Sequence, residues 1–83
     1  MEKIKNFTDL IAWKEAHNLV LFVYETTKKF PREESFGLTN QTRRAVISVT
    51  SNIAEGFGRF YFKDKLVFFY HSRGSLFEVK HFL

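Results

Sequence analysis

Apolar residues recur at every third or fourth position through most of this chain, which is the spacing of one face of an α-helix. The pattern runs through residues 9–29, 39–57 and 62–83. Pro31 lies between the first two segments, where its fixed backbone ends a helix. The pattern predicts an all-α fold, an antiparallel up-down helical bundle formed as a single domain over residues 1–83.

The starts of the first two helices are predicted from side chains that accept bonds from free backbone N–H groups. Thr8 or Asp9 is expected to cap the first helix, and Thr39 or Asn40 the second. The connector between these helices spans residues 31–38. It begins with the proline, and the residue before a proline disfavours helical geometry.

The second helix carries an apolar face that is expected to pack in the core: Leu38, Thr42, Ala45, Val46, Val49, Ile53 and Phe57. A polar stripe follows another face and comprises Gln41, Arg44, Ser48, Asn52, Glu55 and Arg59. Glu55 precedes Arg59 by four positions, the order that favours an ion pair. We interpret the stripe as a structural polar network or a subunit interface, with solvated surface and a ligand site as alternatives. Gly56 and Gly58 are expected to provide a C-cap or a kink.

The third helix is apolar on two nearly opposite sides. One side carries Phe62, Leu66, Phe69, Tyr70, Leu76, Phe77 and Leu83. The other side carries Phe68, Val79 and Phe82. A helix that is apolar on two sides is normally covered on two sides. We therefore expect Phe68, Val79 and Phe82 to form an oligomer face that another copy of the chain covers.

The chain is short, so its own core gives a thin stability margin. A chain of 83 residues buries roughly 60–65% of the surface that it exposes when unfolded. It contains no Cys, which rules out disulfides and leaves oligomerisation as a way to bury more surface. No apolar run reaches the roughly 18–20 residues of a membrane span, and Glu2 and Lys3 do not begin a signal peptide. A cytoplasmic protein without membrane contact is expected.

The chain is basic, with a formal net charge of +4, which favours contact with RNA or DNA. The simpler alternative is that the charge only aids solubility. The candidate nucleic-acid contacts would form a basic rim: Lys28, Lys29, Arg32, Arg43, Lys63 and Lys65. Phe60, Tyr61 and Phe62 are the best candidates for stacking on single strands, although aromatic residues at helical spacing are core residues in most cases.

No arrangement of residues in the sequence predicts a catalytic, metal or cofactor site. Neither His71 nor His81 has a second ligand four residues away, and His17 lies at the edge of the first helix's apolar face. The sequence has no His-Glu-x-x-His pattern, Gly-rich phosphate loop or Ser-His-Asp set. We expect a protein that is not an enzyme and that uses no metal, cofactor or small-molecule substrate.

Several blocks of residues, taken in order, resemble the bacterial four-helix bundle proteins first noticed in reading frames within intervening sequences of 23S rRNA genes. The blocks are Leu10–His17, Phe30–Glu34, Gly37–Thr39, Gln41–Ala45, Ser51–Gly56, Gly58–Arg59 and Arg73–Ser75. The Asn-Ile-Ala-Glu-Gly block over residues 52–56 is the most specific, and the resemblance extends from Phe7 to Glu78. Relatives of this group include the accessory protein of diversity-generating retroelements, which binds nucleic acid and a reverse transcriptase.

The resemblance implies a four-helix protomer that assembles into a ring-like homopentamer. The chain departs from the family pattern because the fourth helix is expected to be missing. Phe69, His71 and Ser72 also stand where the family usually has aliphatic residues or Ala. We expect a non-enzymatic, self-assembling helical scaffold or accessory protein with a basic surface for nucleic acid. The alternatives are a dedicated RNA- or DNA-binding module and a truncated relative with no retained activity.

Overall fold

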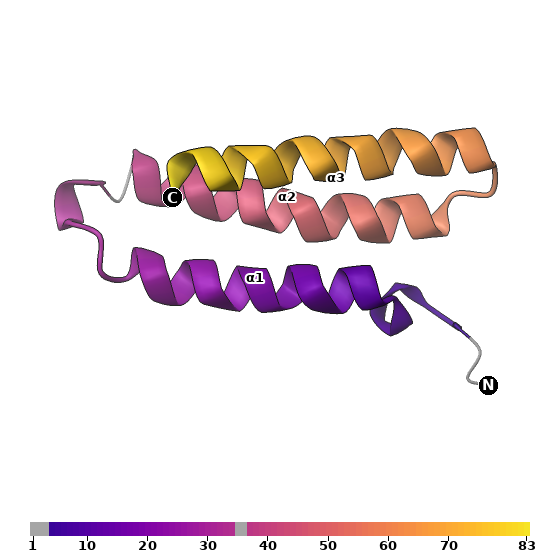
Figure 1. Cartoon of the computed structure of the whole chain (residues 1–83), viewed down its shortest axis with the longest axis horizontal. Coiled ribbons are helices and arrows are strands. Elements are labelled where there is room, and N and C mark those ends of the chain that lie inside the picture. The colour runs from indigo at the N-terminus through magenta and orange to yellow at the C-terminus, as the bar shows by residue number, and fades with distance from the viewer. Residues whose placement is uncertain (1–3, 35–36) are drawn as a thin grey trace.

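The computed structural model describes residues 4–34 and 37–83. Within these residues, three α-helices and two short 3-10 helices follow one another: η1 (Phe7–Asp9), α1 (Ile11–Thr27), η2 (Arg32–Glu34), α2 (Leu38–Gly58) and α3 (Phe62–Phe82). Figure 1 shows α2 lying between α1 and α3, with consecutive helices antiparallel. Residues 1–3, on which the expected absence of a signal peptide partly rests, and residues 35–36 of the connector lie outside the described residues.

The all-α bundle predicted from the periodicity is confirmed, and each helix end lies within two residues of its predicted position. The core lies along α2. One cluster joins Val23 of α1 to Val46 of α2 and Val79 of α3, and a second joins Ala16 to Ile53. The predicted apolar face of α2 is buried or half-buried throughout.

The start of α1 differs from the prediction. Asn6 caps η1, where its side chain accepts the backbone N–H of Thr8 at 2.9 Å. Asp9 closes the capping box from the other side and accepts the backbone N–H of Asn6 at 3.2 Å. The cap position of α1 itself is Leu10, which has no polar side chain. Thr8 and Asp9 therefore stabilise the preceding turn, and the prediction that one of them caps α1 is wrong.

The two ends of α2 also differ from the prediction. Gly37 occupies the cap position, and Thr39 and Asn40 lie inside the helix. At the other end, Gly56 is buried inside α2, which continues to Gly58, and the C-cap position is Arg59. A Cβ atom on Gly56 would lie 2.7 Å from a ring carbon of Phe69. Gly56 therefore serves the close approach of α3 to α2.

The side of α3 that was predicted to face another copy of the chain is the side that is buried. Val79 is 1% exposed and belongs to the core, and Phe68 and Phe82 are half-buried on the same side. The buried residues of α3 are Ser72, Ser75 and Val79. The expectation that Phe68, Val79 and Phe82 form an uncovered oligomer face is therefore wrong. Small serines on this side let α3 approach α2, and larger residues such as Tyr70 and Phe77 are left exposed.

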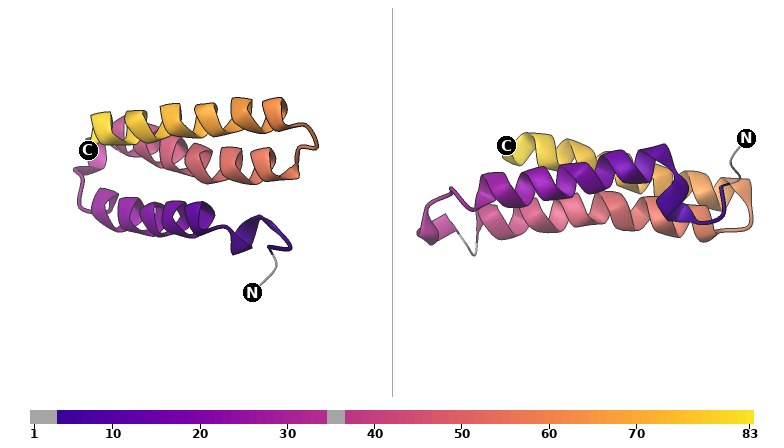
Figure 2. Two further views of the ribbon diagram at one scale, coloured as in Figure 1. Left: turned by 45° about the vertical axis from the view of Figure 1, so that its right-hand side comes forward. Right: turned by 90° about the horizontal axis from the view of Figure 1, so that it is seen from below.

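The three helices form a layer rather than a closed bundle. The principal extents of the molecule are 45 × 26 × 15 Å, and α3 lies closer to α2 than α1 does (Figures 1 and 2). Within residues 4–34 and 37–83, no Cα atom of α1 lies within 8 Å of a Cα atom of α3. No helix therefore lies over the side of α2 that faces the space between α1 and α3. Only side chains of these two helices approach it. None of the described helices combines the length and the apolar character needed to cross a membrane.

Candidate assembly and nucleic-acid surfaces

The middle of the predicted polar stripe forms a network between α2 and α3. The Ser75 hydroxyl donates to Ser48 Oγ at 2.8 Å. The Asn52 amide donates to the Ser48 carbonyl oxygen at 2.8 Å and to Ser48 Oγ at 3.0 Å. On the neighbouring turn, Ser72 Oγ donates to the Val49 carbonyl oxygen at 2.8 Å. The bonds from Ser72 and Ser75 join α3 to α2, whereas the two bonds from Asn52 lie within α2.

The two ends of the stripe face solvent. Glu55 and Arg59 form an ion pair at 3.4 Å, and the Arg59 guanidinium lies 4.5 Å from the centre of the Phe68 ring. Gln41 and Arg44 are exposed at the other end of α2. They line a hollow of about 470 Å³ that also contains polar groups of both helices, including Glu78. The structure thus brings Ser48 and Asn52 into a network with α3 and leaves the other four stripe residues at the surface.

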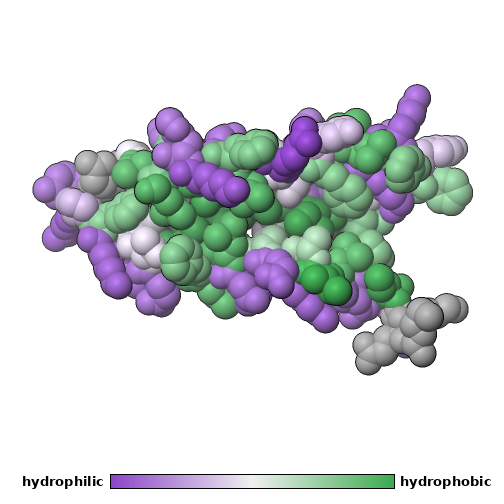
Figure 3. All heavy atoms as spheres, in the orientation of Figure 1, coloured by the Kyte–Doolittle hydropathy of each residue, from purple (hydrophilic) through white to green (hydrophobic). Residues whose placement is uncertain are grey.

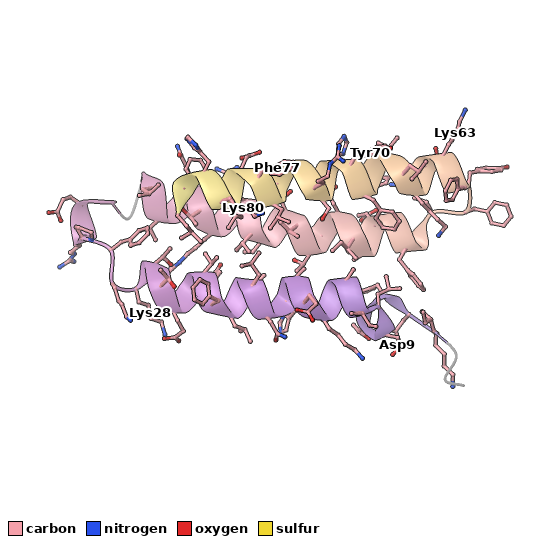
Figure 4. The ribbon with its side chains drawn as sticks, viewed as in Figure 1. Asp9, Lys28, Lys63, Tyr70, Phe77 and Lys80 are labelled. Atoms are coloured by element: carbon pink, nitrogen blue, oxygen red, sulfur yellow. The ribbon has the colours of Figure 1, made fainter. Side chains whose placement is uncertain are left out.

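The candidate basic residues lie at opposite ends of the molecule, as Lys28 and Lys63 show in Figure 4. Lys28, at the end of α1, forms an exposed ion pair with Glu25 at 3.0 Å. Lys29 and Arg32 follow it in the chain and are exposed. The six candidates therefore do not form the single basic rim expected from the sequence.

Two of the six basic candidates bond to residues of another helix. The Arg43 Nε group donates to the Thr27 hydroxyl at 2.8 Å, and its guanidinium lies 4.5 Å from the centre of the Tyr24 ring. Lys65 Nζ donates to the Phe57 carbonyl oxygen at 2.9 Å and to that of Gly56 at 3.4 Å. A cation at this position interacts favourably with the C-terminal end of α2. Arg43 therefore joins α2 to α1, and Lys65 joins the start of α3 to the end of α2.

An apolar groove, which the sequence reasoning did not find, runs between α1 and α3. It has a volume of about 530 Å³, and Val49 and Ile53 of α2 contribute to it together with residues of both neighbouring helices. Ala12 and Ala16 of α1 leave room on one side, and Leu76 of α3 lies on the other. Figure 3 shows the apolar residues that gather on this face of the molecule. Two alanines four residues apart on α1 are the sequence signal that could have indicated a hollow here.

The exposed side of α3 carries two large aromatic residues and Arg73, whose guanidinium lies 5.1 Å from the centre of the Tyr70 ring. We call Tyr70 and Phe77, which are 57% and 59% exposed, the α3 ridge. Figure 4 labels both residues along α3. The ridge is adjacent to the groove because α3 forms one side of the groove.

Within the described residues, no group of three or more His, Cys, Asp or Glu side chains is placed to hold a metal ion. His17 stacks on Trp13 with ring centres 5.0 Å apart. The pKa of Asp9 is lowered because its carboxylate accepts the backbone N–H groups of Lys5 and Asn6. This shift accompanies a structural capping box.

Comparison with protein families decides the relationship suggested by the sequence blocks. Residues 8–83 match the family described as 23S rRNA-intervening sequence protein. The chain belongs to this family. A search of the curated proteins found no match, and a search of the solved structures found none either. The name of the 23S rRNA-intervening sequence protein family specifies no reaction and no ligand, so the role of this member is argued from its surfaces.

Proposed function

We propose that this 23S rRNA-intervening sequence protein is a non-enzymatic helical scaffold or accessory protein that assembles with copies of itself. The observation that carries the proposal is the apolar surface left uncovered along α3. Tyr70 and Phe77 project from the helix, and the groove beside them is lined mainly by apolar residues. Exposed aromatic side chains beside an apolar groove are typical of interaction sites.

A second copy of the chain is the occupant that these surfaces favour. The α3 ridge is convex and aromatic, and the groove is concave and apolar, so one chain carries both halves of a contact. A contact between two different patches of identical chains is heterologous, and it produces a ring when the rotation closes. This geometry supports the ring-like homopentamer that the family resemblance implies.

The free energies of burial and of association indicate that the α3 ridge and the apolar groove must both be buried for two chains to associate. Burying one aromatic side chain contributes about 1.5–3 kcal/mol. Association costs an estimated 4–15 kcal/mol in lost translational and rotational freedom. Two ridge rings alone would barely offset this cost, whereas the ridge seated in a groove that includes Val49 and Ile53 adds the apolar area of both partners.

Light scattering coupled to size exclusion at micromolar concentration tests the proposal. We expect a mass several times that of one 9.9 kDa chain. The double substitution Tyr70→Ser with Phe77→Ser should shift the mass toward that of a monomer while helicity measured by circular dichroism is retained. Phe22→Ser is the matched control, because Phe22 of α1 is 59% exposed, as Phe77 is, and lies outside both surfaces. A compact monomer at all concentrations would remove the proposal.

Binding of RNA or DNA through a basic surface is a second candidate function. Lys29 and Arg32 are exposed near Lys28 at the end formed by α1 and the following connector. One such patch is weak, but copies arranged in an assembly add through multivalency. Binding of this kind weakens steeply as salt rises, because phosphate contacts release counterions. Titration of a duplex at several salt concentrations checks it, and no binding at low salt contradicts it.

A further inference from the structure

The turn between α2 and α3 displays three consecutive aromatic side chains to solvent. Phe60, Tyr61 and Phe62 are 87%, 66% and 73% exposed. The turn lies at the end of the long axis opposite the α1–α2 connector (Figure 2). It is separate from the α3 ridge and from the basic residues near Lys28. Core packing explains none of the three rings, so their exposure needs another explanation.

Hydrogen bonds brace the turn. The backbone N–H groups of Asp64 and Lys65 each donate to the Tyr61 carbonyl oxygen at 3.1 Å. The Lys65 ammonium also donates to the Phe57 carbonyl oxygen across the turn. A preorganised display loses little conformational entropy when a ligand binds. The aromatic rings are thus presented by a braced turn between two long helices.

A hollow of about 370 Å³ lies beside the turn, between η1 and the end of α2. It is lined by Phe7, Ala54, Glu55, Gly58 and Arg59. The space beside Gly58 is open, because a Cβ atom added there would meet nothing within 4 Å. Arg59 offers a guanidinium at the edge of this space, and Lys63 is exposed just beyond the turn.

We propose that the α2–α3 turn and the hollow beside it bind single-stranded nucleic acid. Aromatic side chains stack on unpaired bases of any sequence, and neighbouring cations follow the phosphates. The rings of Phe60 and Tyr61 are 5.1 Å apart and nearly perpendicular, at 86°. Their free faces therefore point in different directions and accept two splayed bases, which a duplex does not offer. In the proposed complex, the exposed Lys63 contacts phosphates next to these bases, and Arg59 does so when its exposed ion pair with Glu55 opens.

The charge near the turn gives little attraction to an anionic membrane surface. Near the turn there are three positive side chains, Arg59, Lys63 and Lys65, and two negative ones, Glu55 and Asp64. The sum is a single excess positive charge. An anionic membrane contributes only about 1 kcal/mol per basic residue, so one excess charge gives little attraction. Stacking needs no such excess, because each base contributes through its own ring surface.

Fluorescence anisotropy with labelled oligonucleotides of about 12 nucleotides, within the usual range of single-strand sites, tests the proposal. We expect a single strand to bind at least about tenfold more tightly than a duplex of the same sequence. Phe60→Ser combined with Tyr61→Ser should weaken single-strand binding by about tenfold or more, as expected from the loss of two stacking contacts. Both positions are exposed, so circular dichroism should report an unchanged fold.

Gly58 provides a second test with a control at the same position. Gly58→Leu fills the hollow and should lower single-strand affinity, whereas Gly58→Ala should leave it unchanged. Equal affinity of the wild type and the Phe60/Tyr61 double variant would overturn the proposal, as would equal affinity for single strand and duplex. So would binding to phosphatidylserine vesicles that the double variant loses while oligonucleotide binding persists. The Tyr70/Phe77 variant leaves the α2–α3 turn unchanged and should still bind single strands. Failure of the assembly proposal can therefore be distinguished from failure of this one.

Discussion

The helices α2 and α3 have the same length, 21 residues, but they use their side chains in opposite ways. In α2, apolar residues such as Val46 and Val49 turn inward, and charged residues such as Arg44 and Glu55 turn outward. In α3, Ser72 and Ser75 are buried, whereas Tyr70 and Phe77 are exposed. The difference shows that close approach with satisfied hydrogen bonds can decide which side of a helix is buried. The larger apolar side is then left for another partner.

The largest expected effect comes from reversing the polarity of the inward side of α2. Val46→Asp places a carboxylate at a position with no exposed surface. An unpaired buried charge costs about 3–5 kcal/mol, which approaches the entire stability of a small domain, about 5 kcal/mol at the lower end. We expect the variant to be largely unfolded by circular dichroism. Ile47→Asp is the control, because Ile47 is the exposed neighbour on the same helix; unfolding of both variants would contradict the assignment of sides.

A smaller effect is expected where α2 and α3 come closest. Gly56→Val adds a branched side chain where even a Cβ atom would lie 2.7 Å from Phe69 and 3.2 Å from the Cβ atom of Phe68. Overpacking of this kind costs about 1–3 kcal/mol. We expect a loss near the middle of this range in urea unfolding. Gly58→Ala should cause no loss and a gain of up to about 1 kcal/mol, from its better helix propensity.

If Gly56→Val and Gly58→Ala had the same effect on stability, the close approach of the helices would not be what requires Gly56. The comparison is well matched, because both glycines lie in the last turn of α2 and neither has a positive φ angle. Only the space around the added atoms differs. The result therefore separates backbone propensity from helix packing.

The same contrast explains which parts of the fold the sequence predicts. The buried side of α2 is clear from the sequence, because its apolar residues recur at helical spacing on one face. On α3 the apolar residues surround much of the helix. The side with fewer apolar residues was predicted to face another copy of the chain, but it is the side that is buried. The deciding residues are the small ones, Gly56, Ser72 and Ser75. Their effect depends on the facing helix, which a single-helix pattern does not contain.

The candidate surfaces were predictable to different extents for the same reason. Ser48 and Asn52 lie on one face at helical spacing, so their common environment follows from the sequence. Lys28 and Lys63 come from different helices, and only the arrangement of the bundle places them at opposite ends. The apolar groove depends on the separation of α1 and α3, which no property of either helix alone specifies. Features within one helix were thus accessible, and features between helices were not.

The smallest expected effect tests whether hydrogen bonding helps α3 choose its buried side. Ser72→Ala keeps the side chain small and removes only the bond from its hydroxyl to the Val49 carbonyl oxygen. The net loss of one such bond is about 1 kcal/mol, measurable as a lower urea midpoint with an unchanged slope. Ser51→Ala is the control, because the Ser51 hydroxyl is exposed and bonds only within α2, so its change should stay below about 0.5 kcal/mol. A Ser72→Ala protein as stable as the wild type would mean that close packing alone selects the serine side of α3.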